Sequence, residues 1–154
     1  MLPRLSSEEL LACCASRRWA LHMDANAPYP DVRKLLATSD AEIAELGWRD
    51  VLEALAAHPR IGQQPAGPSR EARWSRQEQS AAAGAGADAE LRVANEEYER
   101  TFGRVFLINA SGRTADDVLT ELRRRLDNNE VAERAEVRRE LAAIVRGRLA
   151  RCAE

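Results

Sequence analysis

One histidine of this sequence stands where a helix is expected to end. His58 is one of two histidines in the chain, and it directly precedes Pro59 in the segment HPRIG. A residue before proline is disfavoured in the helical conformation, so we expect His58 to close a helix and to point its ring away from a packed turn. Histidine can give up a proton near neutral pH, so His58 is a candidate general acid, but taken alone its position is explained more simply as an accident of a loop.

A second set of polar side chains follows in the segment SRQEQ. Ser75, Glu78 and Gln79 are spaced i, i+3 and i+4, so they share one face if the segment is helical. Ser75 and Glu78 also match the capping-box pattern, which predicts that a helix begins here and that its free N–H groups favour anions. A capped, solvated helix start is the plainer explanation of Ser75 and Glu78 taken alone, but it does not explain Gln79.

An arginine interrupts an apolar stripe in the last predicted helix. Val137, Leu141 and Ile144 fall at i, i+4 and i+7, and Arg148 at i+11 continues the same face. Two interpretations of this inward arginine stay open. Its side chain either snorkels to the rim or pairs with a structural carboxylate, or it binds an anionic ligand in a cleft through its two-pronged guanidinium.

The rest of the pattern predicts helices almost throughout, and therefore an all-α protein. Capping patterns and apolar spacing place helices at about residues 7–25, 31–37, 40–46, 48–57, 75 onward, 88–102, 114–126 and 130 to the end. Residues 60–70, rich in glycine and proline, are expected to form a loop, and residues 83–87 a flexible connector. The apolar run at residues 105–108 is either extended or the start of a buried helix; an extended run leaves backbone groups available for a ligand.

Length and cysteine content limit the class of protein. The chain has 154 residues with 45% hydrophobic content, which fits one domain over residues 1–154. The three cysteines are Cys13, Cys14 and Cys152, and an odd count with an adjacent pair suits a reducing compartment, so we expect a cytoplasmic protein. No apolar run approaches the roughly 20 residues of a membrane span, and the first residues lack the order of a signal peptide.

Charge and residue content argue against several functions. The 23 basic and 25 acidic residues give a net charge of -2, which offers no footprint for nucleic acid, and the run Arg123 to Arg125 is interpreted as a solvated helix face. Lys34 is the sole lysine and has no partner motif, which argues against Schiff-base chemistry. His22 and His58 with these cysteines give no zinc spacing, and no phosphate-binding glycine motif occurs. We therefore expect no metal and no cofactor.

Several segments together resemble one enzyme family. These are CCASRRWA at 13–20, AAHPRIG at 56–62, WSRQEQ at 74–79, NEEYERTFGRVFLINASGR at 95–113 and IVRGRL at 144–149. They are similar to 2-oxo-4-hydroxy-4-carboxy-5-ureidoimidazoline (OHCU) decarboxylases, the last enzymes of urate breakdown to allantoin. The resemblance covers nearly the whole chain, and the HPxxG and SxxEQ elements are specific only jointly. It implies a two-layer all-helical fold, a homodimer, and a cofactor-free carboxy-lyase that forms (S)-allantoin.

The resemblance also assigns roles to individual residues. The family's proton donor matches His58 and its ligand-contacting proline matches Pro59. The SxxEQ residues match Ser75, Glu78 and Gln79, with Glu78 the second catalytic group; the main-chain ligand segment falls on Phe106, Leu107, Ile108, Asn109 and Ala110, and the C-terminal arginine on Arg148. Two departures, Gln63 for a common acidic residue and Ser80 for a frequent glycine, bear on loop conformation.

The chemistry of the implied reaction asks for such groups. Loss of CO2 beside C=N and C=O leaves a carbanion equivalent that the substrate's own ring delocalises, so no external electron sink is needed. The protein must supply positioning, hydrogen bonds and one proton on one face, delivered by His58 or by a water. No single group is assigned to the substrate carboxylate.

Two other classes of function stay open. A non-catalytic helical module could bind a small anion with Arg148 and the helix start at Ser75, although the presence of His58 and Glu78 argues against it. A structural partner of another urate-pathway enzyme is the second, and no long apolar stripe is left over to support it.

Overall fold

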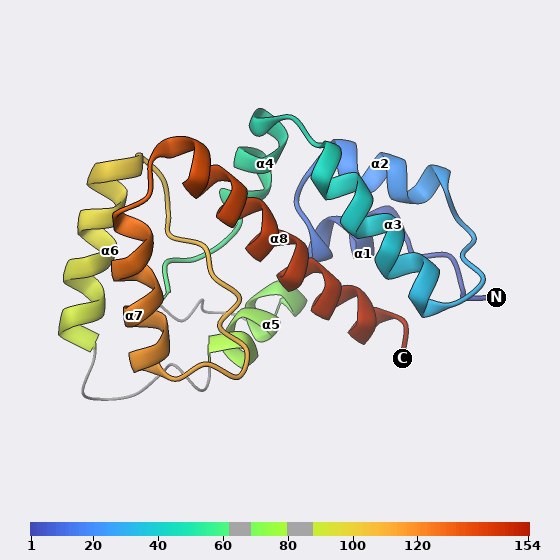
Figure 1. The fold of residues 1–154 in the computed structure, drawn as a ribbon. Coiled ribbons are helices and arrows are strands. Elements are labelled where there is room, and N and C mark those ends of the chain that lie inside the picture. The colour runs from blue at the N-terminus through green and yellow to red at the C-terminus, as the bar shows by residue number, and fades with distance from the viewer. Residues whose placement is uncertain (62–68, 80–87) are drawn as a thin grey trace. The chain divides into compact units, whose positions relative to one another are not determined.

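The computed structural model describes residues 1–61, 69–79 and 88–154, and these form helices and no strand. The helices are α1 (Ser7–Cys13), α2 (Arg17–Ala25), α3 (Val32–Glu45), α4 (Trp48–Leu55), α5 (Arg70–Gln79), α6 (Asp88–Phe102), α7 (Ala115–Leu126) and α8 (Glu130–Cys152) (Figure 1). The all-α prediction is confirmed for this part of the chain. The two sequence departures, Gln63 and Ser80, and most of the predicted loop and connector lie outside the described residues.

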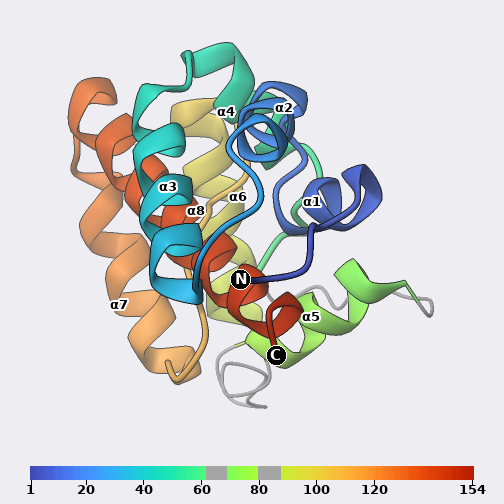
Figure 2. The ribbon, with the colours of Figure 1, turned by 90° about the vertical axis from the view of Figure 1, so that its right-hand side faces the viewer.

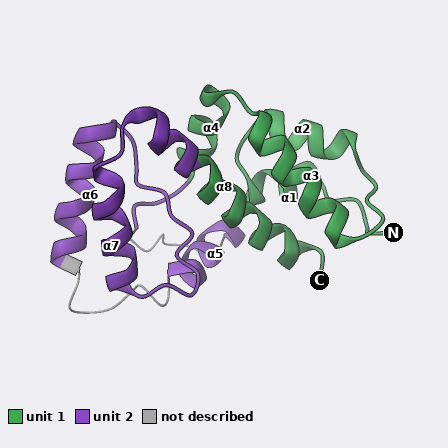
Figure 3. Cartoon of the chain, in the orientation of Figure 1, with its two compact units in different colours: residues 1–57, 138–154 green, residues 58–137 purple. Residues whose placement is uncertain are grey.

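The chain divides into two compact units (Figure 3). Unit 1 consists of residues 1–57 and 138–154, and unit 2 of residues 58–137. Helix α8 begins in unit 2 and ends in unit 1, so one continuous helix belongs to both. The prediction of a single domain over the whole chain stays a prediction.

Unit 1 is built on helices α1, α2 and α3, with α2 packed against both of the others. Its buried apolar side chains include Trp19, Met23 and Ile43. The guanidinium of Arg138 donates to the carbonyl oxygens of Ile43 and Leu46, at 2.8 and 2.7 Å, and so caps the C-terminal end of α3 with a positive charge. The two chain ends lie near each other in this unit (Figure 2).

The first predicted helix is divided in the structure, and the prediction of one helix over residues 7–25 was wrong. Helix α1 ends at Cys13, and Cys14 adopts an extended conformation. Ser16 then caps α2, because its hydroxyl accepts a hydrogen bond from the amide of Trp19 at 3.2 Å. A serine that satisfies a new helix start offers the backbone an alternative to continuing the old helix.

The next two predicted helices are one. Helix α3 runs unbroken through Ser39, and its N-cap is Asp31, whose carboxylate accepts from the amide of Lys34 at 2.8 Å. Ser39 with Glu42 matches the capping-box pattern and predicts a helix start near residue 40, but Ser39 does not cap a helix. It is buried, and its hydroxyl accepts from the indole N–H of Trp19 at 3.2 Å. The serine of this capping pattern therefore makes a tertiary hydrogen bond and not a helix cap.

Unit 2 has its apolar core between α6 and α7. Its members are Ile61, Leu91, Ala94, Tyr98, Phe106, Ile108, Ala110, Val118, Leu119 and Leu122. Gly103 ends α6 at a positive φ of 72°, and Thr114 and Asp117 form the capping box of α7, both as predicted. Residues 105–110 are neither helix nor strand, which decides between the two readings of that run in favour of a non-helical backbone.

Two boundaries in the middle of the chain differ from prediction. Helix α4 ends at Leu55 and not at Ala57. Helix α5 begins at Arg70, where the hydroxyl of Ser69 accepts from the amide of Ala72 at 3.1 Å, so the predicted helix start at Ser75 was wrong. Among the described residues, none of the helices has the length and hydrophobicity that crossing a membrane requires.

Candidate active site

His58 lies just beyond the C-terminal end of α4. The amides of Ala56 and Ala57 donate back to the carbonyls of Leu52 and Ala54, and the chain then leaves the helical path. His58 and Pro59 are half-buried and lie outside any helix. The expectation that the helix ends before Pro59 is confirmed, but the helix is capped by Ala56 and not by His58.

Helix α6 holds the segment that follows His58. Arg60 donates through Nε to the carboxylate of Glu99 at 2.8 Å, and the side-chain amide of Asn95 donates to the carbonyl oxygen of Ile61 at 3.0 Å. Asn95 and Glu99 are spaced i and i+4, so they lie on one face of the helix. Ile61 is buried in the core of unit 2. This short segment is therefore fixed at both its backbone and its side chains.

Helix α5 buries polar side chains on one face. Ser75, Glu78 and Gln79 are buried together with the apolar Ala72 and Trp74. Serine, glutamate and glutamine are seldom buried in the interior of a helix unless their polar atoms serve a specific interaction. The prediction of a shared face is confirmed. The prediction that these residues lie at a helix start is wrong, because they lie in the second half of α5.

The segment Phe106 to Ala110 is buried but has no regular structure. Of its residues, only Asn109 is partly exposed. Within the described part of the chain, the main-chain N–H groups of Phe106, Leu107, Ile108 and Ala110 donate no hydrogen bond. Buried backbone N–H groups almost always have a partner, so these amides are candidates for binding a ligand.

Arg148 lies on the buried side of α8, in unit 1. Its side chain is 5% exposed, and Leu141 and Ile144 on the same stripe are also buried. Snorkelling to the surface is thus excluded. A buried arginine fits both a structural and a ligand-binding role. Burial raises the pKa of Cys14 to about 12, and the nearby positive charge of Arg148 acts in the opposite sense.

The predicted residues fall in both units. His58, Pro59, Ser75, Glu78, Gln79 and residues 106–110 belong to unit 2, and Arg148 belongs to unit 1. Inside unit 2, Ile61 packs in the same core cluster as Phe106, Ile108 and Ala110, which brings the segment after His58 to the predicted main-chain segment.

Sequence reasoning missed Arg125. It belongs to a run of three arginines that was interpreted as a solvated helix face, and that interpretation is wrong for Arg125, which is 1% exposed. The signal was present, because Val118, Leu122 and Arg125 follow the i, i+4, i+7 spacing of a buried helix face, as Arg148 does in α8. Its buried partner Glu133 was missed as well, and so was Tyr98, whose hydroxyl donates to the same carboxylate.

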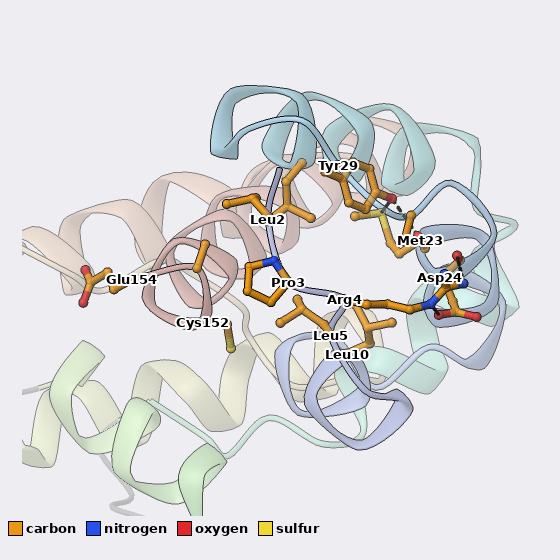
Figure 4. Close-up of a pocket in the computed structure, with 13 residues that line it drawn as sticks. Leu2, Pro3, Arg4, Leu5, Leu10, Met23, Asp24, Tyr29, Cys152 and Glu154 are labelled. Carbon is orange, nitrogen blue, oxygen red and sulfur yellow. Dashed lines mark hydrogen bonds and ion pairs between the residues drawn. The ribbon is translucent and has the colours of Figure 1, made fainter.

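Two other features of the described residues are separate from these. No group of three or more histidine, cysteine, aspartate or glutamate side chains in this part of the chain could hold a metal ion. An apolar pocket in unit 1 is lined by Leu2, Leu5, Met23, Tyr29 and Cys152, and none of the predicted site residues lines it (Figure 4).

Comparison with known proteins identifies the family. The family model for OHCU decarboxylases matches residues 3–150. The uric acid degradation bifunctional protein TTL of Arabidopsis thaliana is 33% identical over 139 residues, which are 86% of this chain and 43% of that protein. This chain therefore spans less than half the length of that relative.

Solved structures agree with this assignment. A crystal structure of OHCU decarboxylase in the presence of (S)-allantoin matches with a TM-score of 0.81 and 30% identity, over 96% of this chain and 98% of that one. A crystal structure of (S)-allantoin synthase matches with a TM-score of 0.65 at 19% identity, over 94% of this chain and 48% of that one, and shows the fold alone. The chain belongs to the OHCU decarboxylase family, a family of carboxy-lyases.

Proposed function

We propose that this chain removes CO2 from OHCU and releases (S)-allantoin without a cofactor. Family membership supports the reaction, and one observation about the molecule carries the proposal furthest. Ser75, Glu78 and Gln79 are buried side by side on one face of α5. A helix that buries three polar groups on one face is suited to line a binding site for a small polar molecule.

His58 is the proton donor in this proposal. Its place just beyond α4, outside any helix, leaves the ring half-exposed and able to meet a ligand. The bonds from α6 to Arg60 and Ile61 hold the segment in place. A general acid needs this combination of access and fixed position.

The other residues bind and orient the substrate. Glu78 accepts hydrogen bonds from N–H groups of the ureido substituent or the ring, while Ser75 and Gln79 fix the orientation. The main-chain amides of residues 106–110 and the guanidinium of Arg148 hold acceptor oxygens, since both are hydrogen-bond donors without acceptor capacity.

The reaction balances with these groups alone. The bond between the ring carbon and the carboxylate breaks, CO2 leaves, and the electron pair stays on the ring, which delocalises it between the neighbouring C=N and C=O. Hydrogen bonds to the ring atoms that gain charge lower the barrier. The electron pair moves through the adjacent C=N bond, so the neighbouring ring carbon, which bears the ureido group, takes a proton from His58 on one face. The hydroxyl on the carbon that lost CO2 gives up its proton and becomes a C=O group, which restores the proton that His58 gave up. Protonation on one face fixes the S configuration of the product.

We also propose that the protein is a homodimer in the cytoplasm. The resemblance to the family suggests the dimer, and three free cysteines suit a reducing compartment. Light scattering coupled to size-exclusion chromatography tests the dimer directly: a mass equal to one chain at micromolar concentration would contradict it.

Mixing freshly generated OHCU with the purified protein tests the activity. Optical rotation of the allantoin formed should develop with the protein and not in buffer alone, because uncatalysed protonation on either face gives a racemate. The rate should survive exhaustive dialysis against EDTA. If the protein changes neither the rate nor the rotation, it is not an OHCU decarboxylase. Binding of (S)-allantoin without turnover would instead support the non-catalytic anion-binding module.

A further inference from the structure

A fully buried ion pair joins α7 to α8 in unit 2. Arg125 is 1% exposed and Glu133 is 0% exposed. The Nε atom of Arg125 lies 3.1 and 3.0 Å from the two carboxylate oxygens of Glu133. Glu133 also accepts from the hydroxyl of Tyr98 at 2.5 Å and from the side-chain amide of Asn128 at 3.1 Å. The carboxylate is thus saturated with donors from α6, α7 and the turn before α8.

The same arginine reaches the predicted main-chain ligand segment. Its Nη1 atom donates to the carbonyl oxygen of Leu107 at 2.7 Å. Its guanidinium carbon lies 4.5 Å from the centre of the Phe106 ring, and the Tyr98 ring packs edge-on against Phe106 with centroids 5.1 Å apart. The ion pair therefore fixes both the side chain at position 106 and the backbone at position 107.

Joining the helices does not require this buried pair. Arg124 and Glu136 make a second bridge between α7 and α8, with Nη2 to Oε1 at 2.5 Å and Nη1 to Oε2 at 3.1 Å, and Arg124 is 50% exposed. Apolar side chains of similar volume stabilise a core as well as a buried ion pair does, because the pair must first be stripped of water. The contact that Arg125 makes and Arg124 lacks is the bond to the carbonyl of Leu107.

Because the peptide group is planar, the contact at the Leu107 oxygen also orients the neighbouring N–H group. The bond between Leu107 and Ile108 is trans, and in a planar trans peptide the C=O and N–H groups point in opposite directions. Holding the Leu107 oxygen therefore also sets the direction of the Ile108 N–H. That N–H donates no hydrogen bond within the described residues.

We infer that Arg125 is a positioning residue: by holding the Leu107 carbonyl it aims the Ile108 N–H at an acceptor oxygen of the substrate, and Glu133 and Tyr98 hold Arg125 in place. The inference rests on the proposed decarboxylase function. Arg125 touches no reacting atom in this scheme. It affects the reaction only by setting the orientation of the peptide group between Leu107 and Ile108.

The first test observes the amide directly in the unaltered protein. (S)-Allantoin is titrated into 15N-labelled protein, and the backbone resonances of residues 106–110 are followed by NMR. The Ile108 amide should shift with saturating behaviour, because it gains an acceptor. Saturable binding of (S)-allantoin with an unmoved Ile108 amide would overturn the inference and leave the proposed function standing.

The second test removes the hydrogen-bonded network of Arg125, Glu133 and Tyr98, called the clamp below, while preserving packing. The triple variant Arg125→Met, Glu133→Leu, Tyr98→Phe replaces the buried polar network by apolar groups of similar size, so no partner is left as a lone buried charge. The matched control, Arg124→Met with Glu136→Leu, removes the exposed bridge between the same two helices. Circular dichroism and thermal melts establish that both variants are folded, and Arg125→Lys, which keeps the charge but loses the fork, is a milder substitute for the triple variant.

The clamp variants should lose about 10- to 100-fold in kcat/KM, since a small misplacement of a binding group has effects of this size. Their product should also lose enantiomeric purity, which a merely less stable enzyme would keep. The control should stay within about twofold of the parent protein. Parental kcat/KM and purity in a folded clamp variant would overturn the inference. If the parent protein itself shows no turnover, it is the proposed function that fails.

Discussion

The sulfur atoms of Cys13 and Cys152 lie 3.7 Å apart, although 139 positions separate these residues in the sequence. Cys13 is the last residue of α1, and Cys152 is the last residue of α8. Both belong to unit 1. A disulfide needs a sulfur separation of about 2.05 Å, so the two helix ends must move closer together for the bond to form. The sequence spacing gave no indication of this pairing.

We expect a thiol oxidant such as diamide to link Cys13 to Cys152. The two thiols lose their hydrogens to the azo group, which becomes a hydrazine, and one S–S bond forms. Mass spectrometry should show the loss of two hydrogen atoms from the single chain and one linked peptide pair. The link closes nearly the whole chain into a loop, so the melting temperature should rise by several degrees.

The adjacent Cys14 provides the control for this prediction. It is buried like Cys13, but Cys13 and not Cys14 lies beside Cys152. Cys14→Ser should still form the link, and Cys13→Ser should not. Disulfides between two chains in place of the internal link would contradict the geometry.

The protein should lose stability in alkaline solution through its buried thiols. Burial raises the pKa of Cys14 to about 12, well above that of an exposed thiol. As pH rises from about 9 to about 12, the unfolded chain loses this proton first, so the free energy of unfolding falls. Urea unfolding over this range measures the slope. Cys14→Ala should flatten it, and an identical slope in the variant would show that other groups cause the loss.

Arg148→Lys should weaken ligand binding about 10-fold or more. The side chain is buried on the apolar stripe, and a lysine cannot reproduce two hydrogen bonds from a planar fork. Arg146→Lys is the matched control, because Arg146 is 49% exposed and pairs with Asp40 at 2.7 Å. Titration calorimetry with (S)-allantoin and the KM for OHCU compare the two. Equal effects would assign Arg148 a structural role.

His58→Asn should separate catalysis from stability. The residue is half-buried and outside any helix, so the free energy of unfolding should change by less than about 1 kcal/mol. Loss of a general acid lowers kcat by about 100- to 10,000-fold. His22→Asn is the control, since His22 pairs with Glu42 at 2.7 Å on the surface of unit 1. A His58→Asn variant that forms only (S)-allantoin at the parental rate would remove His58 from the mechanism.

Helix ends fixed by neighbouring residues were predictable from the sequence. Ser6 with Glu9 and Thr114 with Asp117 form capping boxes, and all the atoms involved lie within four positions. Ser39 shows the same local pattern but lies inside α3, because its hydroxyl bonds the indole of Trp19, 20 positions away. A local pattern cannot reveal such a distant partner.

The site was predictable to the same extent. Pro59 indicates that a helix ends before it, and the apolar stripe indicates that Arg148 is buried, because both signals are local. Arg125 was missed since its neighbours in the sequence are exposed arginines. Its partner Glu133 lies in α8 and accepts a further bond from Tyr98 in α6, and only the folded chain brings these residues together.

The division of α8 between the units bears on the order in which the protein is made. Residues 58–137 form unit 2 as one uninterrupted segment, whereas unit 1 needs residues 138–154 in addition to residues 1–57. During synthesis, units nearer the N-terminus generally fold first. Here the order is reversed, because the buried Leu141, Val145 and Leu149 leave the ribosome after all of unit 2. The part of the chain that is translated first is thus the last to be completed.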